Sequence, residues 1–142
     1  MPANPTLMKL MSATNVCWYR LTGGVIGGSF AGRPILLLTT TGRRSGRRRT
    51  TPLVYVEDGE NVVLIASNGG NPWHPDWWLN LEATAEAEVQ VRSERRRVNG
   101  EKAGGEERER LWRLAVEMYS GYEGYQETAN REIPVVVLRP QS

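Results

Sequence analysis

Three consecutive β-strands are predicted by residues 35–67, which read ILLLTTTGRRSGRRRTTPLVYVEDGENVVLIAS. Branched and aromatic side chains are frequent in this stretch, and apolar positions alternate with polar ones in its middle part, as strands do. Asp58-Gly59 is a strong signal for a tight hairpin, and the first connection is also short. Because short connections join neighbouring strands, we expect an antiparallel meander. The three predicted strands are residues 35–41, 49–57 and 61–67.

Patterns on both sides of the meander predict helices and further strands. Apolar residues recur at helical spacing in residues 1–22, which we expect to form an amphipathic helix, and a glycine-rich hinge follows. The chain is therefore expected to comprise a helix and hinge, residues 1–24, and one α+β domain, residues 25–142, with about six antiparallel strands and flanking helices. Downstream we predict a helix at 75–81, strands at 86–91 and 95–103, a helix at 106–119 and a strand at 133–138.

The composition narrows the class of protein. The chain has 142 residues, 39% hydrophobic and 24% charged, which is typical of a soluble globular domain and excludes a disordered or collagen-like chain. Its longest apolar run is too short to span a bilayer, and no secretion signal opens it, so we expect a cytoplasmic protein. Cys17 and His74 are the only residues of their types, so neither an intrachain disulfide nor a histidine-rich metal site is expected.

The connection between the first two predicted strands, residues 42–49, is strongly basic, and we call it the arginine turn. Guanidinium groups bind phosphates and carboxylates through paired hydrogen bonds, and Gly42, Ser45 and Gly46 let backbone N–H groups approach an anion. Three interpretations stay open: a solvated turn, an anion site, or a nucleic-acid contact, for which the turn lacks aromatic residues. The arginines are Arg43, Arg44, Arg47, Arg48 and Arg49, with Arg33 upstream.

A second glycine-rich connection, residues 67–71, follows the third predicted strand, and we call it the glycine loop. A strand that ends in Gly69 and Gly70 leaves a flat backbone surface on which a planar ligand can lie. Taken alone, the segment is equally well an ordinary loop. Together with the arginine turn, at strand ends of the same meander, it favours a site for an anionic ligand.

Aromatic residues follow in two groups. Tyr119, Tyr122 and Tyr125 share one face if the segment is helical, either as packing residues or as an aromatic wall over a ligand, with hydroxyls that donate hydrogen bonds or protons. Gly121 and Gly124 weaken that helix and predict a mobile segment that could act as a lid.

The second aromatic group opens the short predicted helix. At least one of Trp77 and Trp78 is expected in the core, and Asn80 is expected to cap a loop, because an amide inside an apolar helix needs a partner. His74 is expected to be exposed or hydrogen-bonded in a structural role.

Taken in order, these motifs resemble the deazaflavin-dependent nitroreductase family of actinobacteria, whose members use reduced coenzyme F420. The resemblance covers about residues 5–139, and one departure is Asn68, where family members commonly have lysine. It rests on residues 36–46, Arg49, Pro52-Leu53, residues 67–70, Pro75, Trp77, residues 79–81, the three tyrosines and Ile133-Pro134.

The resemblance implies a split β-barrel like that of FMN-binding oxidases of the pyridoxamine-phosphate type. It implies that the arginine turn holds the anionic phosphate and polyglutamyl tail of F420, that Pro52 and Leu53 line the deazaflavin ring, and that the tyrosines border the substrate. The residues that it assigns to the cofactor are Arg43, Arg44, Ser45, Gly46, Arg49, Pro52, Leu53, Ser67, Asn68, Gly69, Gly70, Trp77 and Asn80.

The function expected from this resemblance is hydride transfer from reduced F420 to a menaquinone-like quinone, a nitroaromatic compound or another activated acceptor. Tyr125 is the first candidate for a donor to the reduced acceptor, with Tyr119 and Tyr122 beside it. An FMN-dependent oxidoreductase on the same fold and a non-catalytic F420 carrier are the alternatives, and no nucleic-acid partner is expected. The predicted helix at 1–22 either packs across the barrel or contacts the inner face of the membrane, and the oligomeric state stays open.

Overall fold

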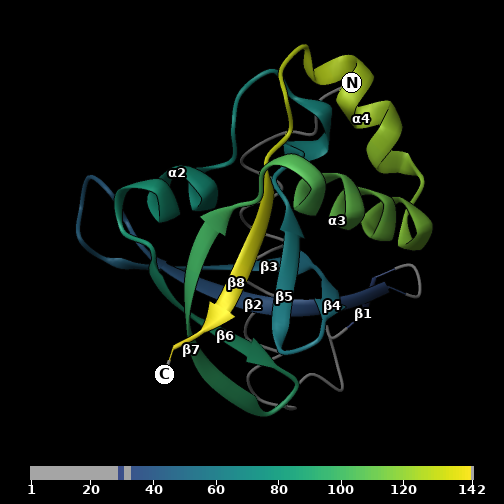
Figure 1. Cartoon of the computed structure of the whole chain (residues 1–142). Helices are drawn as coiled ribbons and strands as arrows, with labels where there is room; N and C mark the ends of the chain where they lie inside the picture. Colours follow the sequence, from purple (N-terminus) through teal and green to yellow (C-terminus); the bar gives the residue numbers. More distant parts are fainter. Residues whose placement is uncertain (1–28, 31–32, 142) are drawn as a thin grey trace.

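Eight strands form one antiparallel sheet in the computed structural model, which describes residues 29–30 and 33–141 (Figure 1). The helix and hinge predicted at residues 1–24 lie outside the described residues. The strands are β1 (Ser29–Phe30), β2 (Arg33–Thr41), β3 (Arg48–Val54), β4 (Val56–Asp58), β5 (Asn61–Ile65), β6 (Glu86–Val91), β7 (Glu94–Lys102) and β8 (Val135–Pro140). The helices are the short 3-10 helix η1 (Asn68–Gly70), α2 (Asp76–Ala83), α3 (Gly105–Met118) and α4 (Gly121–Ala129).

One chain segment forms both ends of the sheet. The strand order is β1-β2-β6-β7-β8-β5-β4, and β3 pairs with the free side of β2. Only Tyr55 separates β3 from β4, so residues 48–58 pair with β2 at one end and with β5 at the other. Figure 1 shows β2 and β3 passing behind β5 and β8 at a steep angle. The sheet thus curls into the split β-barrel that the resemblance implied.

The predicted meander is confirmed, but the number of strands is higher than the predicted six. β2 and β3 form one antiparallel pair, and β4 and β5 form the other. The predicted strand at 49–57 is interrupted at Tyr55, whose ring is buried among the core residues, and the additional strand β1 pairs with the start of β2. The alternating pattern of residues 49–57 carries no sign of this interruption, because apolar residues stand on both sides of it.

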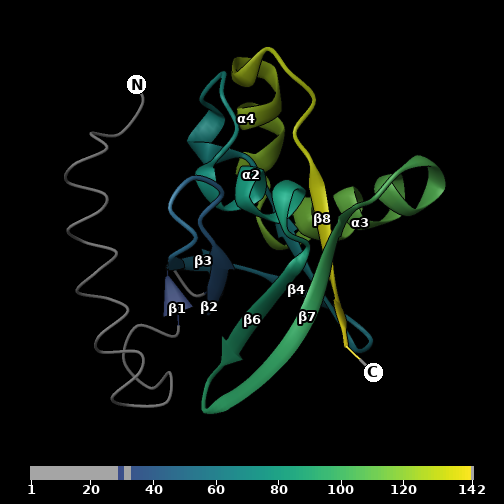
Figure 2. The same cartoon turned by 90° about the vertical axis from the view of Figure 1, so that its left-hand side faces the viewer.

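Two hydrophobic clusters stabilise the barrel. One fills its interior and includes Leu36, Leu38, Val89 and Leu138. The other lies between the outer face of β5 and β8 and the helices α3 and α4, which explains why both faces of these two strands are buried. Figure 2 shows the β6–β7 hairpin extending away from the helices. In the described residues, no helix is long and apolar enough to cross a membrane.

The tyrosine segment differs from its prediction in two respects. The part that contains Gly121 and Gly124 forms a regular helix, α4, in which Tyr122 and Ala129 are buried against the second cluster. Tyr119 does not belong to that helix, because it is the residue at which α3 ends. The spacing of three therefore brings the tyrosines together across a helix junction rather than along one helix.

Candidate functional site

The arginine turn is tightly folded by backbone hydrogen bonds. The Gly42 N–H donates to the Arg47 carbonyl at 2.7 Å, and the Gly46 N–H donates to the Gly42 carbonyl at 2.9 Å. A Cβ atom at Gly42 would lie 2.8 Å from the Ser45 hydroxyl oxygen, so this position has room only for glycine. Gly46 has a φ of +70°, which is the left-handed conformation that glycine adopts most easily.

The arginines of the turn fall into two groups. Arg43 pairs with Asp76 at 3.1 Å, and Arg48 pairs with Glu88 at 2.8 Å. Arg44, Arg47 and Arg49 are exposed, and no carboxylate of the described residues pairs with them. These three guanidinium groups are therefore available to an anion from outside the chain.

Asn80 supports the turn from the adjacent helix α2. Its side-chain carbonyl accepts the Arg43 backbone N–H at 3.1 Å and the Arg43 guanidinium at 2.9 Å. Its amide donates to the Thr40 hydroxyl at 3.2 Å. The prediction that Asn80 caps a loop is confirmed. Asn80 is 4% exposed and Trp77 is 6% exposed within the barrel interior, so these two cofactor candidates lie beneath the turn rather than on its open face.

Replacement of Asn80 by alanine is expected to lower the free energy of unfolding by about 1–3 kcal/mol, because it leaves a backbone N–H and a buried hydroxyl without their partner. Urea denaturation of the two proteins measures the difference. Asn99→Ala is the matched control, since Asn99 is exposed and its side-chain carbonyl accepts an exposed hydrogen bond from Gln141, and its loss should stay below about 0.5 kcal/mol. An equal loss in both variants would contradict the supporting role of Asn80.

The glycine loop adopts three successive left-handed residues. Asn68, Gly69 and Gly70 have φ values of 48°, 63° and 82°. Glycine adopts positive φ values easily, and asparagine tolerates them better than most other residues. A Cβ atom at Gly70 would lie 2.5 Å from the Thr128 hydroxyl oxygen and 3.3 Å from the Tyr125 Cα atom. The absence of a side chain at Gly70 therefore lets the loop pack directly against α4, beside Tyr125.

The three tyrosines form one cluster with two roles. The hydroxyl oxygens of Tyr119 and Tyr125 are 2.9 Å apart and share a hydrogen bond. Tyr122 lies below them, with its ring 5.0 Å from that of Tyr119 in an edge-to-face arrangement, and burial raises its pKa to about 12. The bond to Tyr119, and then burial, raise the pKa of Tyr125. The hydroxyls of Tyr122 and Tyr125 are therefore protonated at neutral pH, and that of Tyr125 can donate to an acceptor.

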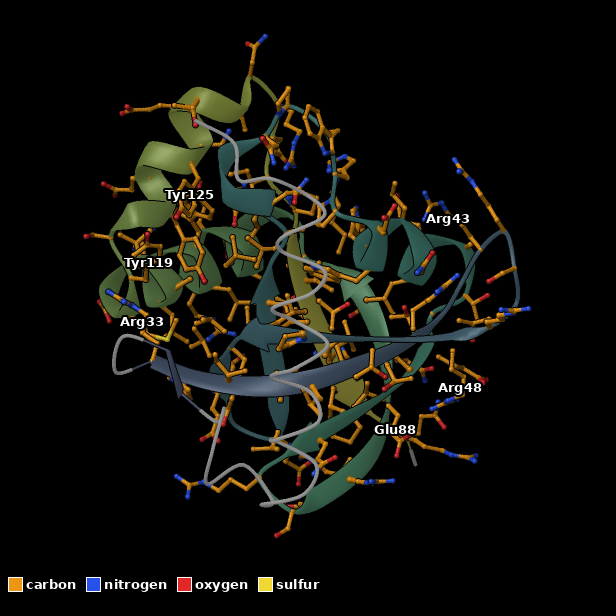
Figure 3. The ribbon with its side chains drawn as sticks, turned by 180° about the vertical axis from the view of Figure 1, so that it is seen from behind. Arg33, Arg43, Arg48, Glu88, Tyr119 and Tyr125 are labelled. Carbon is orange, nitrogen blue, oxygen red and sulfur yellow. The ribbon has the colours of Figure 1, made fainter. Side chains whose placement is uncertain are left out.

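Arg33, upstream of the arginine turn, lies instead beside the tyrosine cluster. Its guanidinium lies 4.3 Å from the centroid of the Tyr119 ring, a cation–π contact. Arg33 and Thr41 are the two ends of the nine-residue strand β2, which is roughly 26 Å long. Figure 3 shows Arg33, Tyr119 and Tyr125 on one side of the molecule and Arg43 and Arg48 on the other.

Comparison with known proteins places this arrangement in a family. The family model described as F420H(2)-dependent quinone reductase matches residues 11–140. The chain belongs to this family. One F420H(2)-dependent quinone reductase of Mycobacterium tuberculosis (strain ATCC 25618 / H37Rv) is 40% identical to it over 124 residues, which are 84% of this chain and 83% of that protein. The resemblance inferred from the motifs is confirmed.

Solved structures agree with the family and with the fold. A structure described as an F420-H2 dependent reductase (FDR-A) is 42% identical, with a TM-score of 0.70, and the match covers 75% of this chain and 95% of that one. A structure from Listeria innocua, described as a pyridoxamine 5'-phosphate oxidase, has a TM-score of 0.54 at 10% identity, over 76% of this chain and 84% of that one. The second likeness concerns the fold alone.

Pro52 and Leu53 cannot both line one ligand with their side chains in this member of the F420H(2)-dependent quinone reductase family. They are neighbours on β3, and successive side chains of a strand point to opposite faces of the sheet. Leu53 packs against the barrel interior, whereas Pro52 stands opposite Leu37 in the ladder with β2. The sequence motif has them adjacent, but the strand geometry separates them.

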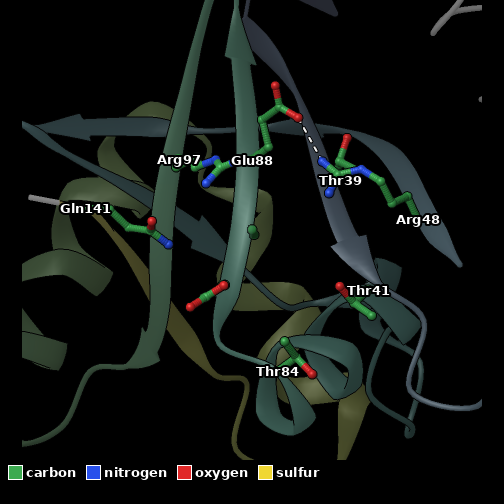
Figure 4. Close-up of a pocket in the computed structure, with 9 residues that line it drawn as sticks. Thr39, Thr41, Arg48, Thr84, Glu88, Arg97 and Gln141 are labelled. Carbon is green, nitrogen blue, oxygen red and sulfur yellow. Dashed lines mark hydrogen bonds and ion pairs between the residues drawn. The ribbon is translucent and has the colours of Figure 1, made fainter. Parts of the chain in front are cut away.

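A cavity of about 480 Å³ lies away from the residues that the motifs predict (Figure 4). It is formed on the outer face of β2, β6 and β7, and its lining is polar, with the ion pair between Arg48 and Glu88 at one side. None of the site residues predicted for this chain lines the cavity.

Arg131, which lies between α4 and β8, belongs to none of the sequence motifs. Its guanidinium hydrogen-bonds His74 Nδ1 at 2.9 Å and also reaches backbone carbonyls of the glycine loop. His74 is therefore hydrogen-bonded, as predicted. Nothing in the local sequence distinguishes Arg131 from the other arginines of this chain, because its hydrogen-bond partners lie about sixty residues away along the sequence.

Proposed function

We propose that this chain binds reduced coenzyme F420 along the face between the arginine turn and the tyrosine cluster, and that it reduces a quinone there. One observation supports the proposal above the others. In a member of this family, guanidinium groups that pair with no carboxylate of the described residues stand at one end of β2, and the hydrogen-bonded hydroxyls of Tyr119 and Tyr125 stand at the other. An extended ligand with one anionic end and one reactive end fits this polarity (Figure 3).

The residues present fit an anionic cofactor. Arg44 and Arg49 form no ion pair with the residues that the structure describes, so they can bind a phosphate or the carboxylates of the tail without first breaking such a pair. Arg43 is committed to Asn80 and Asp76, and its role is to shape the turn. The left-handed backbone at Gly69 and Gly70 offers the loop surface for the ring system, with Ser67 at its start.

Reduced F420, when bound, supplies the hydride, and the chain supplies position and a proton donor. Hydride addition leaves a negative charge on a quinone oxygen, and a hydroxyl of the pair Tyr119–Tyr125 donates to that oxygen. The raised pKa of Tyr125 keeps its proton in place until the acceptor develops that charge. Nitroaromatic compounds develop charge on oxygen in the same way, so they are a second acceptor class for the same site.

Titration of the purified protein tests this function. We expect saturable binding of F420, weaker binding of FMN, whose single phosphate needs fewer cations, and no binding of an oligonucleotide at physiological salt. We also expect oxidation of reduced F420 when menadione, a menaquinone analogue without the isoprenoid tail, is added. Binding of F420 without turnover of any quinone or nitro compound would favour a carrier, and preferential FMN binding would favour the flavin enzyme.

The Tyr125→Phe substitution is expected to lower kcat roughly 10- to 100-fold and to change the Kd for F420 by less than twofold. The reason is that it removes one hydroxyl of the donor pair but keeps the ring. Stopped-flow oxidation of reduced F420 and a binding titration measure the two quantities.

Tyr122→Phe is the matched control for this substitution, because the Tyr122 ring is buried beneath the pair. Its kcat should stay within about twofold of that of the unmodified protein. If Tyr122→Phe lost as much turnover as Tyr125→Phe, the donor would be Tyr122; an equal loss of turnover and F420 affinity in Tyr125→Phe would assign that residue to binding.

A further inference from the structure

Arg131 fastens the glycine loop with every part of its guanidinium. Its Nε donates to the Asn71 carbonyl at 3.2 Å, and its Nη2 donates to the carbonyls of Ala66 at 3.2 Å and Ser67 at 3.1 Å. Its Nη1 donates to His74 Nδ1 at 2.9 Å. One side chain thus bonds the loop at its start, at its end and at the residue that leads into α2.

The other end of this connection is fixed to α4. The Gln126 side-chain amide donates to the Arg131 carbonyl at 2.5 Å, and its side-chain carbonyl accepts the Ile133 N–H at 3.0 Å. Gln126 follows Tyr125 directly, so the backbone that carries Arg131 is held by α4, the helix that carries Tyr125, one member of the hydroxyl pair. Arg131 therefore joins two structures that the proposed function uses: the loop surface for the cofactor and the hydroxyls for the acceptor.

The acceptors of Arg131 are all uncharged when His74 is neutral. Burial lowers the pKa of Arg131, and among the described residues no carboxylate pairs with it. A planar fork of five N–H groups can reach several carbonyls at fixed angles, which an ammonium group cannot do. The contacts thus depend on the shape of the guanidinium and not only on its charge.

We propose that Arg131, with His74 as one of its acceptors, is a positioning residue that sets the spacing between the F420-facing glycine loop and the Tyr119–Tyr125 pair. This inference rests on the proposed function, because that function assigns the cofactor to the loop and the acceptor to the pair. Correct spacing between a hydride donor and its acceptor is a large part of such catalysis. Gly70 contributes from the other side, since its missing side chain lets the loop lie against α4.

His74 makes this device sensitive to acid. Burial, followed by the positive charge of Arg131, lowers its pKa below the ordinary value; Lys102 adds to this effect and Glu82 opposes it. At neutral pH the ring is uncharged, and Nδ1 accepts from Arg131. Protonation at a pH below the ordinary histidine range removes that acceptor and places two cations side by side. The contact is therefore complete at neutral pH and is lost as the pH falls.

Hydrogen exchange without any cofactor tests the fastening itself. In Arg131→Gln, the amides of residues 66–74 should exchange at least tenfold faster than in the unmodified protein, while those of β5 and β8 keep their rates. Arg110→Gln is the matched control, because it removes an arginine with two hydrogen bonds to Asp58, which lies beside the start of β5 and not at the end that leads into the glycine loop. Unchanged exchange in residues 66–74 would overturn the inference.

Binding and kinetics test the positioning. We expect Arg131→Gln to raise the Kd for F420 about tenfold and to lower kcat, with the acceptor KM within twofold. Arg131→Lys keeps the charge but not the fork, and its Kd should stay at least threefold above that of the unmodified protein. Full rescue by lysine would mean that Arg131 acts through its charge on the cofactor, and would overturn the inference.

If the Arg131 variants fold poorly, the less disruptive substitution His74→Asn can be compared with the unmodified protein. His74→Asn offers an uncharged acceptor at every pH, so its Kd for F420 should rise less between pH 7 and pH 5 than that of the unmodified protein. Identical pH profiles would exclude the role of His74. If the unmodified protein binds no F420, the proposed function fails, and the exchange experiment still decides whether Arg131 fastens the loop.

Discussion

The Gly70→Ala substitution is expected to lower the free energy of unfolding by roughly 2–5 kcal/mol. The φ of +82° strains any residue with a side chain, and the new Cβ atom would overlap the Thr128 hydroxyl and press on the backbone of α4 at Tyr125. The Thr128 hydroxyl can rotate away, but the backbone at Tyr125 gives way only if the loop and the helix move apart by a few tenths of an ångström. Urea denaturation measures the loss, and the Kd for F420 should rise at the same time.

Gly69→Ala is a closely matched control for this substitution. Gly69 has a φ of +63°, so alanine is strained there too, but the added Cβ would lie more than 4 Å from the surrounding atoms of the described part of the chain. Its cost should be that of the backbone strain alone, about 1–2 kcal/mol. The difference between the free energies of unfolding of the two variants then measures the effect of the close contact between the loop and α4. Equal losses at the two positions would contradict the close packing described for Gly70.

The double substitution Arg44→Ala/Arg49→Ala is expected to weaken F420 binding roughly 100-fold or more at low salt. Each guanidinium can form charge-assisted hydrogen bonds to a phosphate or carboxylate, worth about 1.5–3 kcal/mol each. Neither residue forms an ion pair within residues 29–30 and 33–141, so the fold should lose little stability. Raising the salt concentration should weaken binding by the unmodified protein and affect the double variant less.

Arg110→Ala/Arg113→Ala is the control for the double variant, because it changes the net charge equally. Both residues lie on α3 and pair with Asp58 and Glu109. F420 affinity should fall less than threefold in this protein. A loss as large as that of the arginine-turn variant would show that general attraction of a basic protein, rather than the turn, holds the cofactor.

Local patterns predicted most of the fold because the strands and helices here carry their own signals. Strict alternation marks residues 86–91, which form β6 with the predicted bounds, and the acidic start and apolar stripe of α3 place that helix within one residue at each end. Asp58-Gly59 predicts the hairpin between β4 and β5. These features depend on neighbours in the sequence, which a pattern can capture.

The site was only partly predictable, because its remaining features depend on residues that are distant in the chain. The motifs indicate the arginine turn and the glycine loop, and a resemblance between ordered motifs identified the family. They do not indicate that Arg33 lies over the Tyr119 ring, nor that Arg131 reaches back to the glycine loop. Alternation also shows that Pro52 and Leu53 face opposite ways, once the strand is known.

The segment 48–58 has a consequence for how this chain can change in length. The same eleven residues pair in register with β2 at one end and with β5 at the other. A single inserted residue would shift one of these two pairings by one position, so the side chains of that strand would switch faces and its apolar side chains would be exposed. The tip at Arg92-Ser93 differs, because it connects the two strands of a single pair, β6 and β7. We infer that homologues vary in length at that tip. They should keep the same length across the bend at Tyr55, because the same segment there pairs with strands of both halves of the barrel.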